Sequence, residues 1–151
     1  MKLDILAFGA HPDDVELGAG GILATHAARG LKTGIVDLTR GEMGTRGTPE
    51  IRDEEAKEAA KILGCAVREN LGMPDGRVDY SHESQLRVAQ IIRKYRPDIV
   101  IMNAPTDRHP DHGRASRLVE EACFLSGLHK IELEINGEKL MPWRPKNMYK
   151  Y

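Results

Sequence analysis

The sequence lacks the features of several classes of protein. It has only two cysteines, Cys65 and Cys123, which form no CxxC pair, so we expect two free thiols in a reducing cytosol. Its 22 Lys and Arg residues nearly balance its 23 Asp and Glu residues, which gives no bulk attraction to nucleic acid or to an anionic membrane. No apolar run is long enough to span a bilayer, and the first residues do not resemble a signal peptide. We therefore expect a cytoplasmic protein with neither nucleic acid nor membrane as a partner.

The composition is that of one globular domain. Hydrophobic residues make up 40% and charged residues 30% of the 151 residues, a balance that supports a buried core. Four short apolar runs are typical of strands that are buried on both faces of a parallel sheet. These runs are Leu3–Gly9, Gly34–Thr39, Cys65–Leu71 and Asp98–Asn103.

Helical patterns alternate with these runs and define the expected fold. They cover Leu17–Arg29, the stretch between Thr48 and Gly64, the stretch between Ser81 and Pro97, and residues from about His112 to Ser126. The alternation predicts an α/β protein with a Rossmann-like, doubly wound, mostly parallel sheet of the 3-2-1-4-5 type in three α/β/α layers. Beyond Gly127 the pattern weakens to a loop or hairpin over Ile131–Leu140 and the start of another strand at Asn147–Tyr151.

Two segments rich in His and Asp follow the first and the fourth predicted strands. They are Gly9–Glu16 and Thr106–His112. In a sheet of this order the two strands are neighbours at the topological switch point, and their carboxyl ends frame the crevice where ligands bind. We therefore expect these segments, which lie far apart in the sequence, to meet in one site.

The spacing within both segments is typical of a metal site. His11 and Asp14 are three residues apart, so their side chains can face the same way. A third ligand, either His109 or His112, would complete a site of two histidines and one carboxylate. Three protein ligands leave a position for water, as in catalytic zinc sites, and Fe²⁺ also accepts these ligands. Asp13 is then placed to take a proton from that water.

Other polar residues of these loops are candidate catalytic or substrate contacts. The histidine of the second segment that does not bind metal could stabilise an oxyanion or protonate a leaving group, and Asp111 could orient a neighbouring imidazole. The loop Arg40–Thr48 is either a substrate loop or merely solvated, and Arg52 either binds substrate or pairs with Glu55 on the surface. The candidate substrate contacts are Arg46, Arg52 and Asp107.

The motifs resemble those of a known family. The stretches Ala10-His11-Pro12-Asp13-Asp14-Val15-Glu16 and His109-Pro110-Asp111-His112 look like the metal motifs of the LmbE-like, or PIG-L, de-N-acetylases. The stretch Asp37–Glu50, Arg52 and the stretch Asn70–Gly76 resemble the branch that deacetylates N-acetylglucosaminyl-malate in bacillithiol synthesis. The resemblance extends from Leu3 to about Leu128.

The resemblance implies a role for each residue of the site. His11, Asp14 and His112 are the implied ligands of Zn²⁺, and Asp13 is the implied general base. His109, tuned by Asp111, is the implied group that stabilises the oxyanion or protonates the amine, and Arg52 is implied to contact the malyl carboxylates. The implied substrate is a small N-acetylglucosamine conjugate, and acetate is released. Family members are longer and form homo-oligomers, so we expect residues 1–151 to be a single domain that lacks a C-terminal part.

Three alternatives remain open on the sequence. The substrate could be a chito-oligosaccharide or another N-acetylglucosamine conjugate. Two histidines and a carboxylate also form the facial triad of non-haem iron enzymes. A non-catalytic metal- or sugar-binding module is the third alternative. Asp13 distinguishes a hydrolase from the last two alternatives, because only the hydrolase needs a free carboxylate beside the metal.

Overall fold

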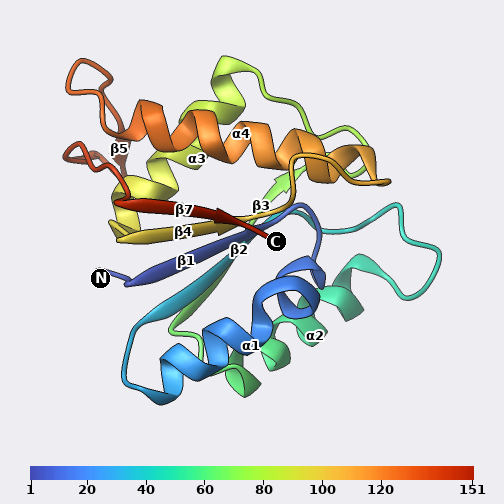
Figure 1. Ribbon diagram of the computed structural model, residues 1–151. Helices are drawn as coiled ribbons and strands as arrows, with labels where there is room; N and C mark the ends of the chain where they lie inside the picture. Colours follow the sequence, from blue (N-terminus) through green and yellow to red (C-terminus); the bar gives the residue numbers. More distant parts are fainter.

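The computed structural model describes residues 1–151 as a five-stranded sheet with helices on both faces (Figure 1). Helices α1 (Asp14–Ala28) and α2 (Pro49–Ile62) cover one face, and α3 (His82–Tyr95) and α4 (Pro110–Ser126) cover the other. The strands of the sheet are β1 (Ile5–Gly9), β2 (Thr33–Thr39), β3 (Val67–Met73), β4 (Ile99–Met102) and β7 (Asn147–Lys150). Their order is β3-β2-β1-β4-β7 and every pairing is parallel, which confirms the predicted fold class.

The strands differ in burial according to their place in the sheet. All residues of β1 and β2 are buried, as expected for central strands that are covered on both faces. The third strand was predicted to be equally buried, and this prediction is wrong. In β3 only Met73 is fully buried, because this strand forms an edge of the sheet. The predicted hairpin is present as β5 (Glu134–Ile135) and β6 (Glu138–Lys139), and the predicted last strand pairs with β4 as β7.

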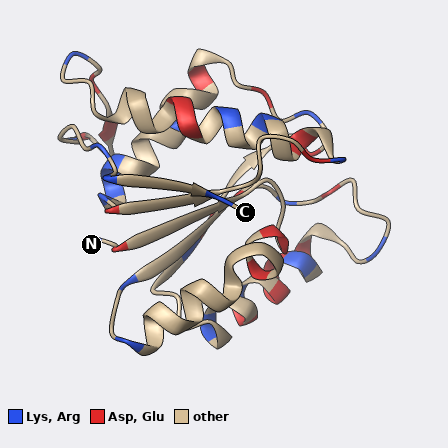
Figure 2. Ribbon diagram, viewed as in Figure 1, with Lys and Arg blue, Asp and Glu red and all other residues tan.

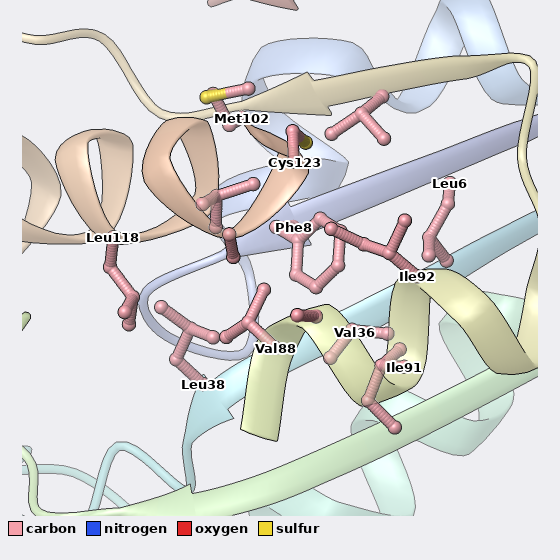
Figure 3. Packing of buried hydrophobic residues seen from close by; sticks show 14 of the residues in the cluster. Leu6, Phe8, Val36, Leu38, Val88, Ile91, Ile92, Met102, Leu118 and Cys123 are labelled. Atoms are coloured by element: carbon pink, nitrogen blue, oxygen red, sulfur yellow. The ribbon is translucent and has the colours of Figure 1, made fainter. Parts of the chain in front are cut away.

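Two apolar clusters hold the layers together, one on each face of the sheet. Successive side chains of a strand point to opposite faces. Leu6 and Phe8 of β1 therefore pack into the larger cluster, which α3 and α4 cover (Figure 3). Ile5 and Ala7 pack into the smaller cluster on the face that α1 covers. Both cysteines are free, as expected.

Helix α1 begins earlier than expected and buries a different face. The sequence pattern predicts a start at Leu17 with that residue on the apolar face, but Leu17 is 85% exposed and the helix begins at Asp14. The buried face carries Val15, Ala19 and Leu23 instead. Between Val15 and Leu23 this face holds only the small residues Ala19 and Gly20, so it gives little hydrophobic periodicity, which explains the misplaced face.

The remaining helices follow their capping signals. Thr48 and Ser81 accept hydrogen bonds from the amides of Ile51 and Ser84, each at 3.3 Å, as N-caps do. Helix α4 begins at Pro110, two residues before the expected start, because proline is suited to the first helical position. None of the helices is long and apolar enough to cross a membrane.

Candidate metal centre and active site

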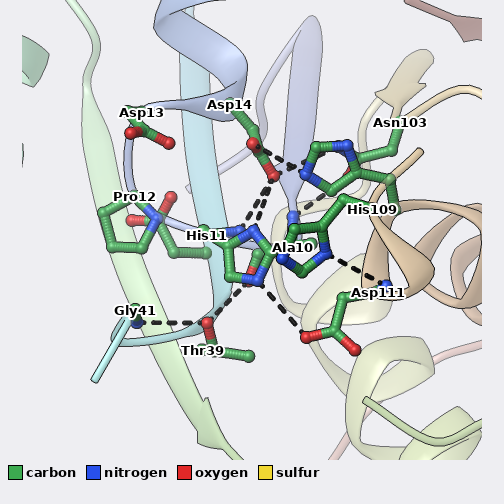
Figure 4. Close-up of polar contacts among 12 residues, drawn as sticks. Ala10, His11, Pro12, Asp13, Asp14, Thr39, Gly41, Asn103, His109 and Asp111 are labelled. Carbon is green, nitrogen blue, oxygen red and sulfur yellow. Dashed lines mark hydrogen bonds and ion pairs between the residues drawn. The ribbon is translucent and has the colours of Figure 1, made fainter. Parts of the chain in front are cut away.

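The two His/Asp segments meet at the carboxyl ends of β1 and β4, which are adjacent strands (Figure 4). Asn103, at the end of β4, joins them. Its Oδ1 accepts a hydrogen bond from the Ala10 amide at 3.0 Å, and its Nδ2 donates to Asp14 Oδ2 at 3.2 Å. The chain turns directly after Gly9, the last residue of β1, where a Cβ would lie 3.0 Å from the His11 carbonyl oxygen. No spacing or motif in the sequence marked Asn103 as part of the site.

Asp14 lies between two histidines. Its Oδ1 is 3.1 Å from His112 Nε2, and its Oδ2 is 3.5 Å from His11 Nδ1. The Asp14 carboxylate is fixed by a further hydrogen bond at 2.9 Å from the His11 amide. The structure therefore brings together the three residues that were expected to bind metal.

The far nitrogens of both imidazoles also face carboxylates. His112 Nδ1 is 3.1 Å from Asp107 Oδ2, and His11 Nε2 is 3.0 Å from Asp75 Oδ1. Histidines that ligate metals usually have their second ring nitrogen hydrogen-bonded to a carboxylate, which fixes the tautomer and the ring orientation. This arrangement leaves His11 Nδ1 and His112 Nε2 as the nitrogens that face Asp14. Two imidazoles and one carboxylate are donors that Zn²⁺ and Fe²⁺ accept, so the residues fit such an ion.

His109 has a different environment. It is the N-cap of α4, and its Nδ1 accepts a hydrogen bond from the Asp111 amide at 3.2 Å. When neutral, its proton is therefore on Nε2. Its ring is stacked on that of His112, with centroids 4.9 Å apart. Ring nitrogens of His11, His109 and His112 lie within 4.8 Å of one another, so His109 is near the other two histidines but has no carboxylate behind it.

The Asp111 carboxylate contacts His11 rather than His109, which was the imidazole it was expected to tune. It is fully buried, and its Oδ2 lies 3.3 Å from His11 Nε2. The same carboxylate accepts hydrogen bonds from the amides of Gly76 and Val78 at 2.7 and 3.2 Å. Asp111 thus fixes the loop that carries Asp75 against His11. The Asn70–Gly76 stretch was noted in the sequence, but its contact with His11 joins distant segments and follows no local pattern.

The charges of the cluster are interdependent. Burial alone would lower the pKa of His11, but its contacts with Asp14, Asp75 and Asp111 raise that pKa to about 9. Burial alone would raise the pKa of Asp14, but hydrogen bonds from His11 and the charge of His112 lower it. The carboxylates around His11 thus favour its positively charged form, and the two histidines favour the ionised form of Asp14.

Asp13 lies beside the cluster and takes no part in it (Figure 4). Its backbone has a φ of 116°. Residues other than glycine rarely adopt this conformation, and those that do are commonly found at functional sites. Its side chain is 59% exposed, and its Oδ2 accepts a hydrogen bond from Arg52 Nη2 at 3.3 Å. Burial of part of the carboxyl group, together with the charge of Asp14, raises the pKa of Asp13 although Arg52 opposes the shift.

Two hollows adjoin these residues. One of about 320 Å³ is lined by residues that include His11, Asp13, Asp14, His109 and His112. The other, of about 500 Å³, lies between the first turn of α1 and helix α2, and it shares Asp13 and Arg52 with the first. Arg46 of the predicted substrate loop also lines it. Acidic residues in the first turns of α1 and α2 lie beside this hollow (Figure 2). Arg52 does not pair with Glu55 but donates to the carbonyl oxygens of Pro12 and Gly41.

Known proteins resemble most of this chain. A family model described as PIG-L: GlcNAc-PI de-N-acetylase matches residues 6–123. The uncharacterized deacetylase YaiS of Escherichia coli K12 is 41% identical over 79% of this chain and 67% of its own length. The diacetylchitobiose deacetylase of Thermococcus kodakarensis is 35% identical over 82% of this chain and 50% of its own length. The probable N-acetyl-alpha-D-glucosaminyl L-malate deacetylase 2 of Bacillus subtilis is 26% identical over 82% and 62%, respectively.

Solved structures give the same relation. The conserved protein TT1542 of Thermus thermophilus superposes with a TM-score of 0.89 and is 49% identical over 97% of this chain and 65% of that chain. GalB, the 4-carboxy-2-hydroxymuconate hydratase of Pseudomonas putida, superposes with a TM-score of 0.78 and is 30% identical over 93% and 62%, respectively. The first two curated relatives are 67% and 50% covered by this chain, so it spans about half to two thirds of their length.

Proposed function

Because this chain belongs to the PIG-L family, we propose that it is a metal-dependent hydrolase that removes the acetyl group from an N-acetylglucosamine conjugate. Its homologues include deacetylases, which hydrolyse N-acetyl amide bonds. The observation that carries the proposal is the pair of histidines backed by carboxylates on either side of Asp14, with the Asp13 carboxylate next to them and in contact with Arg52 alone. A hydrolytic site of this kind needs both features, a set of ligands and a separate base.

The ligand assignment is part of this proposal. His11 Nδ1, His112 Nε2 and the Asp14 carboxylate would hold a divalent metal ion, with zinc preferred and iron(II) as the alternative in the cell. Such an ion would polarise the acetyl carbonyl group and make a water molecule more acidic. Asp75 and Asp107 would keep the two imidazoles in the required tautomers. The role of Asp107 is then to orient His112, rather than to contact substrate as the sequence suggested.

The chain's own groups supply the proton transfers. Asp13 takes a proton from the attacking water as the new C–O bond forms at the acetyl carbon. His109 Nε2–H lies in the same hollow and donates a hydrogen bond to the developing oxyanion. As the C–N bond breaks, the protonated Asp13 returns its proton to the amine nitrogen, so acetate leaves and the Asp13 carboxylate is regenerated. Arg52 keeps the Asp13 carboxylate aimed into the hollow.

The substrate we propose is N-acetylglucosaminyl-malate. The motifs from Asp37 to Gly76 and the relative from Bacillus subtilis support this choice. Arg46 and Arg52 line the larger hollow, where guanidinium groups could bind malyl carboxylates. A diacetylchitobiose-like sugar is the second candidate, which the relative from Thermococcus kodakarensis favours. We further propose one domain over residues 1–151, a cytoplasmic location and, on the family resemblance, a homo-oligomeric protein.

Addition of water to a carbon–carbon double bond is a second candidate reaction. The GalB hydratase shares the fold at 30% identity, so this family fold is compatible with more than amide hydrolysis. The larger hollow contains Arg46 and Arg52, which could hold an unsaturated carboxylic acid as well as a malyl group. The two reactions give different products, so the same assay can separate them.

The test is a panel of substrates with the zinc-loaded protein and a chelator-treated control. We expect acetate release from N-acetylglucosaminyl-malate that exceeds release from diacetylchitobiose, and none after chelation. A preference for diacetylchitobiose would show that the proposed substrate is wrong and the proposed reaction right. Hydration of an unsaturated dicarboxylic acid, without release of acetate, would show that the proposed reaction is wrong. Bound zinc with no turnover of any of these compounds would favour a non-catalytic module.

A further inference from the structure

Arg68 of β3 joins four elements beside the larger hollow. Its Nε and Nη2 donate to the two oxygens of Asp37 on β2 at 2.8 and 3.0 Å. Its Nη1 donates to Glu16 Oε1 on α1 and, at 3.0 Å, to the carbonyl oxygen of Ala56 on α2. The Arg68 side chain is 6% exposed and that of Asp37 is 2% exposed. A bidentate pair in such a buried place is fixed in position.

The residues that Arg68 holds lie directly next to the proposed catalytic groups. Glu16 is in the first turn of α1, three residues after Asp13. Ala56 is one helical turn after Arg52 on α2. Glu16 and Ala56 line opposite sides of the hollow that also contains Asp13 and Arg52. Arg68 therefore sets the spacing between the helix that follows Asp13 and the helix that carries Arg52.

Asp13 needs such support because its backbone is strained. A residue with a φ of 116° keeps that conformation only where its surroundings impose it. Asp14 is held by direct contacts with His11, His112 and Asn103. The turn beyond it is held by the contact of Glu16 with Arg68. The carbonyl oxygen of Asp13 accepts a hydrogen bond from the Leu17 amide at 3.0 Å. This bond couples the strained residue to the first turn of α1.

We propose that Arg68 is a positioning residue for the Asp13–Arg52 pair. It acts through Glu16 and Ala56 and contacts neither the substrate nor the metal ligands. The proposal rests on the proposed function where it concerns turnover, but its structural part stands without it. Neither the motifs nor the spacing in the sequence pointed to Arg68.

The test compares Arg68→Lys with Arg93→Lys. Lysine keeps the charge but cannot span the two oxygens of Asp37 and also reach Glu16 and Ala56. Arg93 is a matched control because it is also buried and its guanidinium donates to four carbonyl oxygens, far from the site. Zinc content, kcat and KM are measured for both variants, together with hydrogen exchange of the Leu17 amide in the metal-free protein.

We expect Arg68→Lys to bind one zinc ion per chain, to lose about tenfold to a hundredfold in kcat, and to exchange the Leu17 amide at least about tenfold faster than the parent. Arg93→Lys should leave kcat unchanged. It should also leave unchanged the ratio of the Leu17 exchange rate to that of the Phe8 amide in β1, which serves as an internal reference. In the double variant with Glu16→Gln, kcat should fall no further than in Arg68→Lys alone.

Unchanged kcat and unchanged Leu17 exchange in folded Arg68→Lys would overturn the proposal. Equal losses of kcat in Arg68→Lys and Arg93→Lys would do so as well, because they would indicate a merely structural role. If the parent protein releases no acetate, the proposed function fails by itself, and the Leu17 exchange comparison still decides whether Arg68 positions the first turn of α1.

Discussion

At the scale of single residues, the environment of each histidine distinguishes its role. The spacing of His109 and His112 left either one as a metal ligand. In the structure, Nδ1 of His112 faces the Asp107 carboxylate, whereas Nδ1 of His109 accepts a hydrogen bond from the Asp111 amide. A carboxylate increases the basicity of an imidazole ligand, and a backbone amide does not. This difference favours His112 as the ligand without reference to any relative.

Substitution of each histidine tests this distinction. We expect His112→Ala to lose stoichiometric zinc, whereas His109→Ala keeps one zinc ion per chain and loses turnover. Asp107→Asn should weaken zinc binding by about tenfold to a hundredfold, because it removes only the carboxylate behind His112. Zinc content after dialysis and competition with a chelator measure these effects. Full zinc binding by His112→Ala, with loss in His109→Ala, would exchange the two roles.

At the scale of elements, helix α1 connects the site to the end of the sheet. Its first turn carries Asp14, and further along it the Tyr151 ring lies over Gly18. A Cβ at Gly18 would overlap the ring, at 2.7 Å from Tyr151 Cγ. The Tyr151 hydroxyl group donates to the Phe8 carbonyl oxygen on β1 at 3.0 Å. A glycine at position 18 therefore permits the contact between α1 and the residue that follows β7.

Two glycines of α1 give a matched pair of variants. Gly21→Ala should stabilise the protein by about 0.5–1 kcal/mol, because alanine favours the helix and nothing lies within 4 Å of the new Cβ. Gly18→Ala has the same intrinsic gain but should destabilise the protein by about 1–3 kcal/mol through overlap with the Tyr151 ring. Urea unfolding measures both changes. Equal stabilisation by the two variants would show that Tyr151 does not pack on α1 in solution.

At the scale of the whole molecule, the sequence predicted the fold better than the contacts within the site. Apolar runs and caps are local signals, and they gave the parallel sheet and placed His11, Asp14 and His112 at adjacent strand ends. The contacts of Asp75 with His11 and of Arg68 with Glu16 join distant segments through side chains. The periodicity of the sequence cannot predict such contacts. The edge position of β3 and the small-residue face of α1 depend on packing between elements, so the sequence pattern missed both.

The whole molecule is proposed to act through a metal held by His11, Asp14 and His112, with Asp13 as the base in amide hydrolysis. The most direct test is acetate release from N-acetylglucosaminyl-malate by zinc-loaded parent protein and zinc-loaded Asp13→Asn, at equal zinc content. We predict release by the parent and a loss of at least about a hundredfold in the variant, since a general base contributes roughly 10²–10⁴-fold. Equal release by the two proteins would contradict the assignment of Asp13 as the base.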